Sequence, residues 1–192
     1  FQTVTYAPHF ISTVVMCGML TLFLNPTSGI FNIIITKLGG ESVNFLQDPA
    51  NFKWIYVLSA VWQEMGWGSI IYFATLSGVD RSLLEAAEID GANRFQKIWY
   101  INVPVLIPTI IILLIVQCGS LLSVGYEKVY LLQNTTNFSG SEVISTYVYK
   151  VGLEQADFSF GAAADLFNSV INSTILILAN FIAKRTTDQG LF

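Results

Sequence analysis

Few side chains in this sequence could carry out covalent chemistry. His9 is the only histidine, and Cys17 and Cys118 are the only cysteines. The carboxylates are scattered along the chain, so no nucleophile, base or set of metal ligands recurs at a useful spacing. The sequence therefore predicts no catalytic residue, no metal site and no bound cofactor. We expect the two cysteines to be packing residues.

Glu64 is the one charged residue of the apolar stretch 54–78. On a helix rising 1.5 Å per residue it lies about 15 Å from the start of that stretch, near the midplane of a bilayer with a ~30 Å core. An ionisable group at that depth is costly and suggests function. Trp67 and Ile71 share its helix face. The alternative is a structural pairing with a buried polar group, such as Asn168, Asn172 or Gln117.

The composition points to a chain that uses lipid as solvent. Of the 192 residues 53% are hydrophobic and only 11% are charged, against about 25% in an ordinary globular domain. Such a chain is too apolar to be disordered, and two cysteines cannot build a disulfide scaffold. The net charge of −4 and the lack of a Lys/Arg cluster argue against a nucleic-acid partner.

The distribution of the charges predicts an all-α, polytopic transmembrane helix bundle. A membrane helix needs about 20 mostly apolar residues, and the apolar faces here are not interrupted by regular charged positions as in a soluble helix. We expect four spans, at about 8–24, 54–78, 104–124 and 165–183. His9, near the start of the first span, is expected to lie at the membrane interface.

The connecting segments differ in character. The segments 25–53 and 125–159 are expected outside. All the arginines lie in the loop 80–103 or after the last span, so the positive-inside rule favours a cytoplasmic location for both of those regions. Because the chain starts at Phe1 rather than Met, we expect it to be the C-terminal part of a longer protein.

The inner loop 80–103 predicts a bent pair of short helices. Ser82 followed by Glu85 fits a capping box that begins a helix, and Gly91 suits the left-handed residue that ends one. A second helix over 92–100 would lead to Pro104, which fits the first turn of the next span. Small residues before the bend would let another protein approach the backbone, with Phe95 as an apolar knob.

The same loop resembles the EAA signature of ABC-importer permease subunits. That signature is EAA, three residues, G, nine residues, I, one residue, LP. It matches Glu85, Ala86, Ala87, Gly91, Ile101 and Pro104, with Val103 in place of the family's leucine. The longer form, with Asp90 and Ala92, resembles the carbohydrate-importer branch. The stretches 125–132, 146–149 and 160–163 are similar to permeases for oligosaccharides derived from plant polysaccharides.

The resemblance implies a type I permease fold, with 1–192 forming a single transmembrane permease domain. Such permeases usually have six helices, so the first two spans would be absent here. It also implies a multi-pass protein of the bacterial cytoplasmic membrane, in contact with lipid. Its expected partners are a second permease subunit, two ATP-binding cassette subunits and an extracytoplasmic solute-binding protein.

The resemblance further implies that this chain is not the motor. It has no GxxxxGK[ST] run to hold a phosphate, so ATP and Mg²⁺ would be used by the partner ATPase. The elbow 80–103 would sit in a groove of that ATPase and pass its closure to the membrane helices, consistent with alternating access. An intramembrane enzyme would need converging catalytic groups. A scaffold protein would have no reason to keep this loop pattern.

For such a permease, the candidate substrate path lies at two places. Trp67 could stack on the apolar face of a sugar while Glu64 accepts hydrogen bonds from its hydroxyls. Tyr126, Glu127 and Tyr130 lie beyond the outer end of the span 104–124 and are a second candidate set. An aromatic belt at the membrane interface would explain the tyrosines equally well. A permease for a non-sugar solute and a non-transport scaffold remain the alternative functions.

Overall fold

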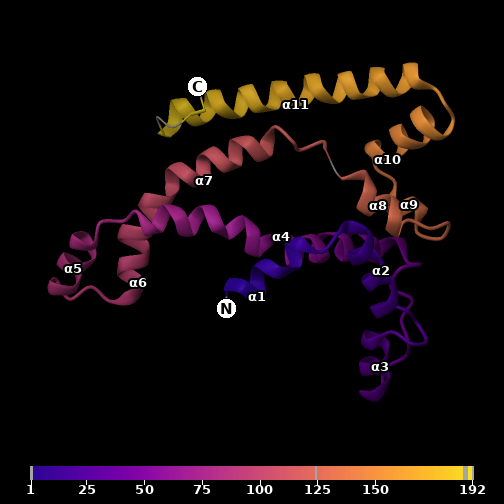
Figure 1. Cartoon of the computed structure of the whole chain (residues 1–192), viewed down its shortest axis with the longest axis horizontal. Coiled ribbons are helices and arrows are strands. Elements are labelled where there is room, and N and C mark those ends of the chain that lie inside the picture. Colours follow the sequence, from indigo (N-terminus) through magenta and orange to yellow (C-terminus); the bar gives the residue numbers. More distant parts are fainter. Residues whose placement is uncertain (1, 124, 188–189, 192) are drawn as a thin grey trace. The chain divides into compact units, whose positions relative to one another are not determined.

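The computed structural model describes residues 2–123, 125–187 and 190–191, and every regular element within these ranges is helical. The predicted all-α class is therefore confirmed. Two π turns, Ile98–Asn102 and Lys150–Glu154, and one 3₁₀ turn, Ala7–Phe10, join or extend the α-helices (Figure 1). The α-helices are α1 Gln2–Tyr6, α2 Thr13–Phe23, α3 Ile30–Lys37, α4 Pro49–Ser77, α5 Arg81–Ile89, α6 Arg94–Lys97, α7 Val103–Cys118, α8 Tyr126–Leu132, α9 Phe138–Ser141, α10 Ile144–Tyr149 and α11 Phe158–Thr187.

The chain divides into two compact units. The first consists of Phe1–Trp67 and Ser123–Leu166, and the second of Gly68–Leu122 and Phe167–Phe192. The first unit holds the segments predicted to lie outside, together with α1, α2 and the first part of α4. The second holds α5–α7 and most of α11.

Two helices of the described ranges are long and apolar enough to cross a membrane. They are Arg94–Cys118, which runs through α6, the π turn and α7, and Phe158–Thr187, which is α11. They contain the predicted spans 104–124 and 165–183, except that α7 ends at Cys118 and residue 124 lies outside the described residues. Both helices begin earlier than their apolar stretches do.

The first predicted span is not one straight helix. Gln2–Phe10 and Thr13–Phe23 meet at 102°, and together they pass the test for a third span. The break lies at residues 11–12, where Ile11 is extended and the Ser12 hydroxyl caps α2 by accepting a hydrogen bond from the Val15 N–H. Because α2 alone has 11 residues, or about 16 Å of helix, it is too short to cross by itself.

α4 contains the remaining predicted span, 54–78. Its 29 residues give about 43 Å of helix, which is more than a bilayer core needs. It has no stretch apolar enough to be counted among the helices that could cross a membrane. Polar residues inside it, such as Gln63 and Glu64, lower its hydropathy. The span at 54–78 therefore stays a prediction.

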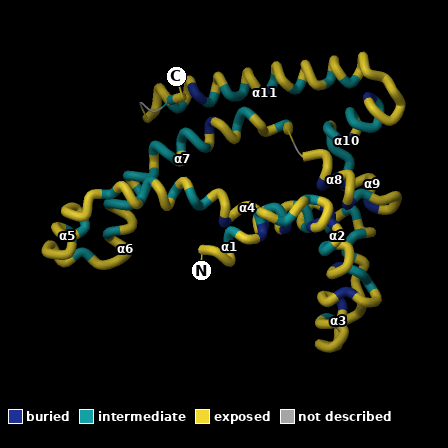
Figure 2. The backbone as a smooth tube through the Cα atoms, in the orientation of Figure 1, coloured by how far each residue is buried: buried dark blue, intermediate teal, exposed yellow. Residues whose placement is uncertain are grey.

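Little of the apolar surface is covered within each unit (Figure 2). Only 6% of the apolar window of Arg94–Cys118 and 11% of that of Phe158–Thr187 is buried. Contiguous exposed apolar surface of this kind needs lipid or a partner protein. In the first unit a small core forms where Cys17 of α2 meets Phe52 of α4 and Val129 and Leu132 of α8.

The second unit is joined by polar contacts and one close approach. The Thr75 and Thr109 hydroxyls lie 3.1 Å apart and link α4 to α7. The Leu122 backbone N–H donates to Asn172 Oδ1 on α11 at 3.3 Å. Gly119, just after α7, lies directly against the Leu176 side chain. These contacts hold α7 beside α11.

Candidate functional site: an exposed helical elbow

The elbow begins at Asp80 rather than at the predicted Ser82. The Asp80 carboxylate accepts a hydrogen bond of 2.9 Å from the Ser82 backbone N–H, which caps the start of α5. This hydrogen bond lowers the pKa of the Asp80 carboxyl. An aspartate can cap a helix as well as a serine can. The predicted pairing of Ser82 with Glu85 is therefore wrong, and α5 starts at Arg81.

α5 is terminated by a left-handed turn at Gly91, two residues after its last helical residue. Gly91 has φ of +76°, a conformation that costs a residue with a Cβ about 1–2 kcal/mol. The Gly91 N–H donates to the Glu88 carbonyl at 3.0 Å and the Ala92 N–H to the Ala87 carbonyl at 2.9 Å. This pair of bonds is a Schellman motif. Gly91 therefore takes the helix-ending conformation that the sequence predicts.

The second arm of the elbow starts with a capping box. The Asn93 side chain accepts from the Gln96 N–H at 2.9 Å, and the Gln96 side chain accepts from the Asn93 N–H at 2.8 Å. Lys97, at the end of α6, reaches back to Glu88 on α5 and binds it at 2.5 Å. α5 and α6 thus fold back on each other as a hairpin (Figure 1).

The second arm is continuous with a membrane helix. We expected a separate short helix over 92–100, but Arg94–Cys118 is one helix of 25 residues. The π turn Ile98–Asn102 lies just before Pro104, and proline has no N–H to lose from the helix. α6 and α7 are therefore joined without a break in the helix.

The elbow displays apolar side chains that nothing in its unit covers. Phe95 is 82% exposed and Ile89 87% exposed. Glu85, Ala86, Asp90 and Pro104 are exposed, whereas Ala87, Ala92 and Ile101 are half-buried. The surface combines small residues, the exposed carboxylates of Glu85 and Asp90 and protruding apolar groups, as a protein-docking surface does. Ile89 was not among the predicted residues, although its place on α5 beside the bend could have indicated it.

The structure brings Glu64 together with His9. His9 Nδ1 lies 3.0 Å from Glu64 Oε2, so a protonated Nδ1 donates to the carboxylate. The His9 ring stacks on Trp67 with 4.3 Å between centroids and 4° between planes. Phe10 packs edge-on against both rings. The partner of Glu64 is thus the histidine expected at the interface, and not one of the three polar residues considered as alternatives.

Neighbouring residues of α4 hold the break between α1 and α2. The Gln63 side-chain amide donates to the Ile11 carbonyl at 2.8 Å. Gly66 touches the Thr5 backbone so closely that a Cβ would not fit. These contacts fix the position of His9 and leave the Glu64 side chain 58% exposed. Sequence reasoning missed His9 because its partners lie 55 positions away.

The outer tyrosines form a cluster with residues of α10 and the turn after it. Tyr126 stacks on Tyr149 at 4.9 Å between centroids, and Tyr130 meets the same ring edge-on at 5.2 Å. The Tyr130 hydroxyl donates to Glu154 Oε1 at 2.7 Å, which raises the pKa of Tyr130. Glu127 is exposed beside them. Tyr149 and Glu154 are the two members that sequence reasoning did not include.

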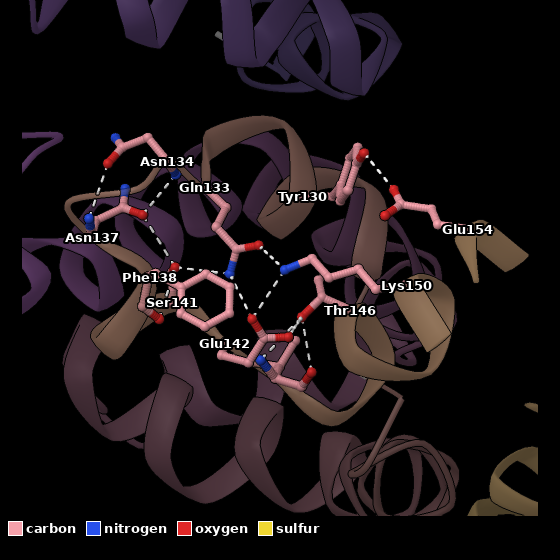
Figure 3. Close-up of polar contacts among 11 residues, drawn as sticks. Tyr130, Gln133, Asn134, Asn137, Phe138, Ser141, Glu142, Thr146, Lys150 and Glu154 are labelled. Atoms are coloured by element: carbon pink, nitrogen blue, oxygen red, sulfur yellow. Dashed lines mark hydrogen bonds and ion pairs between the residues drawn. The ribbon is translucent and has the colours of Figure 1, made fainter. Parts of the chain in front are cut away.

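A polar network positions this cluster (Figure 3). The Lys150 ammonium donates to Gln133 Oε1 at 2.6 Å and to Glu142 Oε2 at 3.0 Å. The Gln133 amide also donates to Ser141 and Glu142. The Thr146 hydroxyl joins the other Glu142 oxygen at 3.1 Å. α8, α9 and α10 are therefore held as one body, which fixes the ring positions of Tyr126 and Tyr149.

The chain matches a family model and close relatives along its length. The model described as "Binding-protein-dependent transport system inner membrane component" covers residues 1–188. Protein LplB of Bacillus subtilis (strain 168) is 40% identical over 191 residues, which is 100% of this chain and 60% of that protein. The polygalacturonan/rhamnogalacturonan transport system permease protein YteP of the same organism is 39% identical, with the same coverage. The chain thus spans about 60% of the length of these curated relatives.

A solved structure has the same fold. The bacterial alginate ABC transporter, in complex with an alginate pentasaccharide-bound periplasmic protein, contains a chain that superposes with a TM-score of 0.94 at 39% identity. The match covers 99% of this chain and 66% of that one.

Proposed function

We propose, from the premise that this chain belongs to the family of binding-protein-dependent transport system inner membrane components, that it forms part of the path by which an ATP-driven importer carries a sugar or oligosaccharide. The whole protein is then a multi-pass permease subunit of the bacterial cytoplasmic membrane. The apolar helices Arg94–Cys118 and Phe158–Thr187 support a place in a membrane. The names of the relatives, which include polygalacturonan/rhamnogalacturonan transport, support a carbohydrate as the cargo.

The elbow formed by α5 and α6 is the proposed coupling element. The observation that carries this proposal is the join of an exposed helix–Gly–helix bend to a 25-residue apolar helix. A partner that grips the bend can move α7 without a flexible link between them. We propose that Glu85, Ala86, Ala87, Asp90, Gly91, Ala92, Phe95, Ile101 and Pro104 make or position this contact.

The motor would be a separate subunit. ATP and Mg²⁺ would act in two ATP-binding cassette subunits, with no catalytic role for this chain. A second permease subunit would complete the path, and an extracytoplasmic solute-binding protein would deliver the cargo. The exposed apolar surface of α7 and α11 supports such neighbours, together with lipid.

The proposed substrate path uses the two aromatic–carboxylate clusters of the first unit. Trp67 presents an indole beside the half-exposed Glu64 carboxylate. Tyr126 and Tyr130 present phenol rings beside Glu154, with Glu127 next to them in sequence. Rings that stack on sugar faces and carboxylates that accept hydroxyl hydrogen bonds are the pairing that a neutral sugar surface requires.

The test is coupled transport by the full-length permease, reconstituted in liposomes with its partner subunits and binding protein. We expect ATP hydrolysis and oligosaccharide uptake to rise together when cargo-loaded binding protein is added. The variant Glu85→Lys should keep membrane insertion and lose the link between the rate of ATP hydrolysis and the rate of uptake. Uptake that needs no ATP, or normal uptake by Glu85→Lys, would contradict the proposed function.

A further inference from the structure

Lys128 on α8 is a buried cation at the edge of an apolar core. The residue is only 8% exposed. Its neighbour Val129, together with Cys17 and Phe52, forms the small hydrophobic core of this unit. Burial lowers the pKa of Lys128. A lysine in such a place is costly unless its charge is compensated.

No carboxylate of the described ranges forms an ion pair with Lys128. Glu64 on α4 acts on it electrostatically from beyond ion-pair distance, and Cys17 on α2 lies close by. The nearest aromatic contact is the Tyr56 ring, whose centroid lies 5.6 Å from Nζ. Lys150, in the same unit, is by contrast fully engaged by Glu142 and Gln133.

The tip of Lys128 is still reachable. No fully occluded side-chain nitrogen or oxygen in the described part of the chain lacks a hydrogen-bond partner. No hydrogen bond from the Lys128 ammonium is found within the described residues, so Nζ is not fully occluded although the residue is buried. A stem packed on apolar groups with a wet, charged tip is how lysine lies at a boundary.

We propose that the Lys128 ammonium binds the carboxylate of an acidic sugar residue as the oligosaccharide passes. This inference rests on the proposed function and names its substrate class: oligosaccharides that contain uronic acids. Glu64 and Lys128 carry opposite charges and do not neutralise each other. Each can therefore bind a different group of one sugar chain: Glu64 accepts hydrogen bonds from hydroxyls, and Lys128 donates to a carboxylate.

The choice of lysine suits transit rather than tight binding. An ammonium is a compact point charge that forms single hydrogen bonds, whereas an arginine would hold a carboxylate by a bidentate fork. A cargo that must leave the site again is better served by the weaker, less directional contact. The cation–π contact with the Tyr56 ring partly stabilises the Lys128 ammonium when no sugar carboxylate is bound to it.

The experiment compares a charged probe with its neutral form in the reconstituted full-length importer. The probes are trigalacturonate and the same trisaccharide with every carboxyl methyl-esterified. The variants are Lys128→Met and Lys128→Gln. The matched control is Lys53→Met, because Lys53 also lies over an aromatic ring, Trp54 at 5.8 Å, but is exposed.

We expect both Lys128 variants to lower kcat/KM for trigalacturonate about tenfold or more relative to the ester, the effect of losing a charge-assisted contact. Lys53→Met should leave that ratio unchanged. Equal loss for both probes, no loss for either, or failure of both variants to assemble would assign Lys128 to structure and overturn the inference. If the wild type imports the ester but not the acid, the inference fails while the proposed function stands. ATP-dependent uptake of neither probe, nor of any other oligosaccharide, would contradict both.

Discussion

Lys97 on α6 donates a hydrogen bond of 2.5 Å to Glu88 on α5, closing the elbow across the Gly91 turn. The contact lowers the pKa of the Glu88 carboxyl. It is formed at the surface, with 67% of the Glu88 side chain exposed. Exposed ion pairs contribute little and are screened by salt. The bend must therefore be held mainly by its backbone, with the ion pair as a minor support.

The first prediction concerns this ion pair. Because the folded-state pKa of Glu88 is lowered, its contribution is present above the carboxyl's ordinary pKa and is lost only as pH falls through the lowered value. Glu88→Gln should thus change the ratio of ATP hydrolysed to sugar imported by less than about twofold, and that ratio should be flat across the neutral pH range. A severalfold change in the ratio would show that the ion pair, and not the turn, holds the elbow.

The second prediction concerns Gly91. A Cβ added there would meet no atom within 4 Å, so the cost of Gly91→Ala comes from the backbone conformation alone. That cost is about 1–2 kcal/mol, or a factor of roughly 5–30 in the population of the turn. Coupled uptake should fall accordingly while membrane insertion is kept. Coupled uptake is measured as the rate of sugar import at saturating ATP.

The controls for Gly91 separate the turn from side-chain bulk. Gly91→Asn should be milder than Gly91→Ala, since asparagine tolerates the left-handed region better. Gly68→Ala, at another glycine with open space around it, should have no such effect, because its φ is not positive. Equal rates of coupled uptake by Gly91→Ala and Gly68→Ala would show that the left-handed turn at Gly91 is not needed for coupling.

The third prediction concerns the docking surface. Glu85 is exposed on α5, on the arm of the elbow that carries the small residues. Reversing its charge with Glu85→Lys should lower coupled uptake by at least about tenfold, the size of a 1.4 kcal/mol loss at an interface. Assembly, read from co-purification of the subunits, should weaken only in the contact to the ATPase. Glu88→Gln serves as the matched control on the same helix.

The fourth prediction concerns Glu64 and His9. Glu64→Ala should raise KM for the cargo about tenfold or more, as expected for a lost hydrogen bond to a charged group, without loss of assembly. His9→Ala should give a smaller rise, because it removes the group that orients the carboxylate. KM is measured from uptake at varied cargo. Unchanged uptake kinetics for Glu64→Ala would return Glu64 to a purely structural role.

The fifth prediction concerns the contact of α1 with α4. Gly66→Ala places a Cβ against the Thr5 backbone, which cannot move as a side-chain tip could. We expect overpacking to cost about 1–3 kcal/mol, seen as a lower melting temperature of the purified full-length protein. Gly68→Ala, two residues on, should be neutral or stabilising because alanine favours a helix interior. Equal stability of the two variants would mean that α1 does not press on α4 at Gly66.

The elbow was predictable because its signals are local. Gly91 as the end of α5 follows from residue type and spacing alone. The cap was misplaced by two residues, since Asp80 and Ser82 are both good caps. The continuity of α6 with α7 does not follow from the sequence, because Pro104 indicates the start of a helix, whereas a π turn just ahead of it lets the helix run on.

The membrane helices and the clusters were less predictable for a different reason. Apolar runs found α7 and α11, but the 102° break before α2 was missed, although Ser12 is a residue type that caps helices. The contact of His9 with Glu64 and that of Tyr130 with Glu154 join residues 55 and 24 positions apart. Such pairings depend on how helices pack, which one sequence does not reveal.

The most direct measurement is a cross-link from the elbow to the ATPase. A photo-reactive side chain at position 86, in place of Ala86, is placed in the full-length permease within intact membranes that contain the whole importer. We expect a cross-link to the ATP-binding subunit, which changes in yield when ATP is bound, and no reaction with a membrane-impermeant reagent added from outside. Labelling of position 86 from outside, with no cross-link to the ATPase, would contradict the proposed coupling role of the elbow.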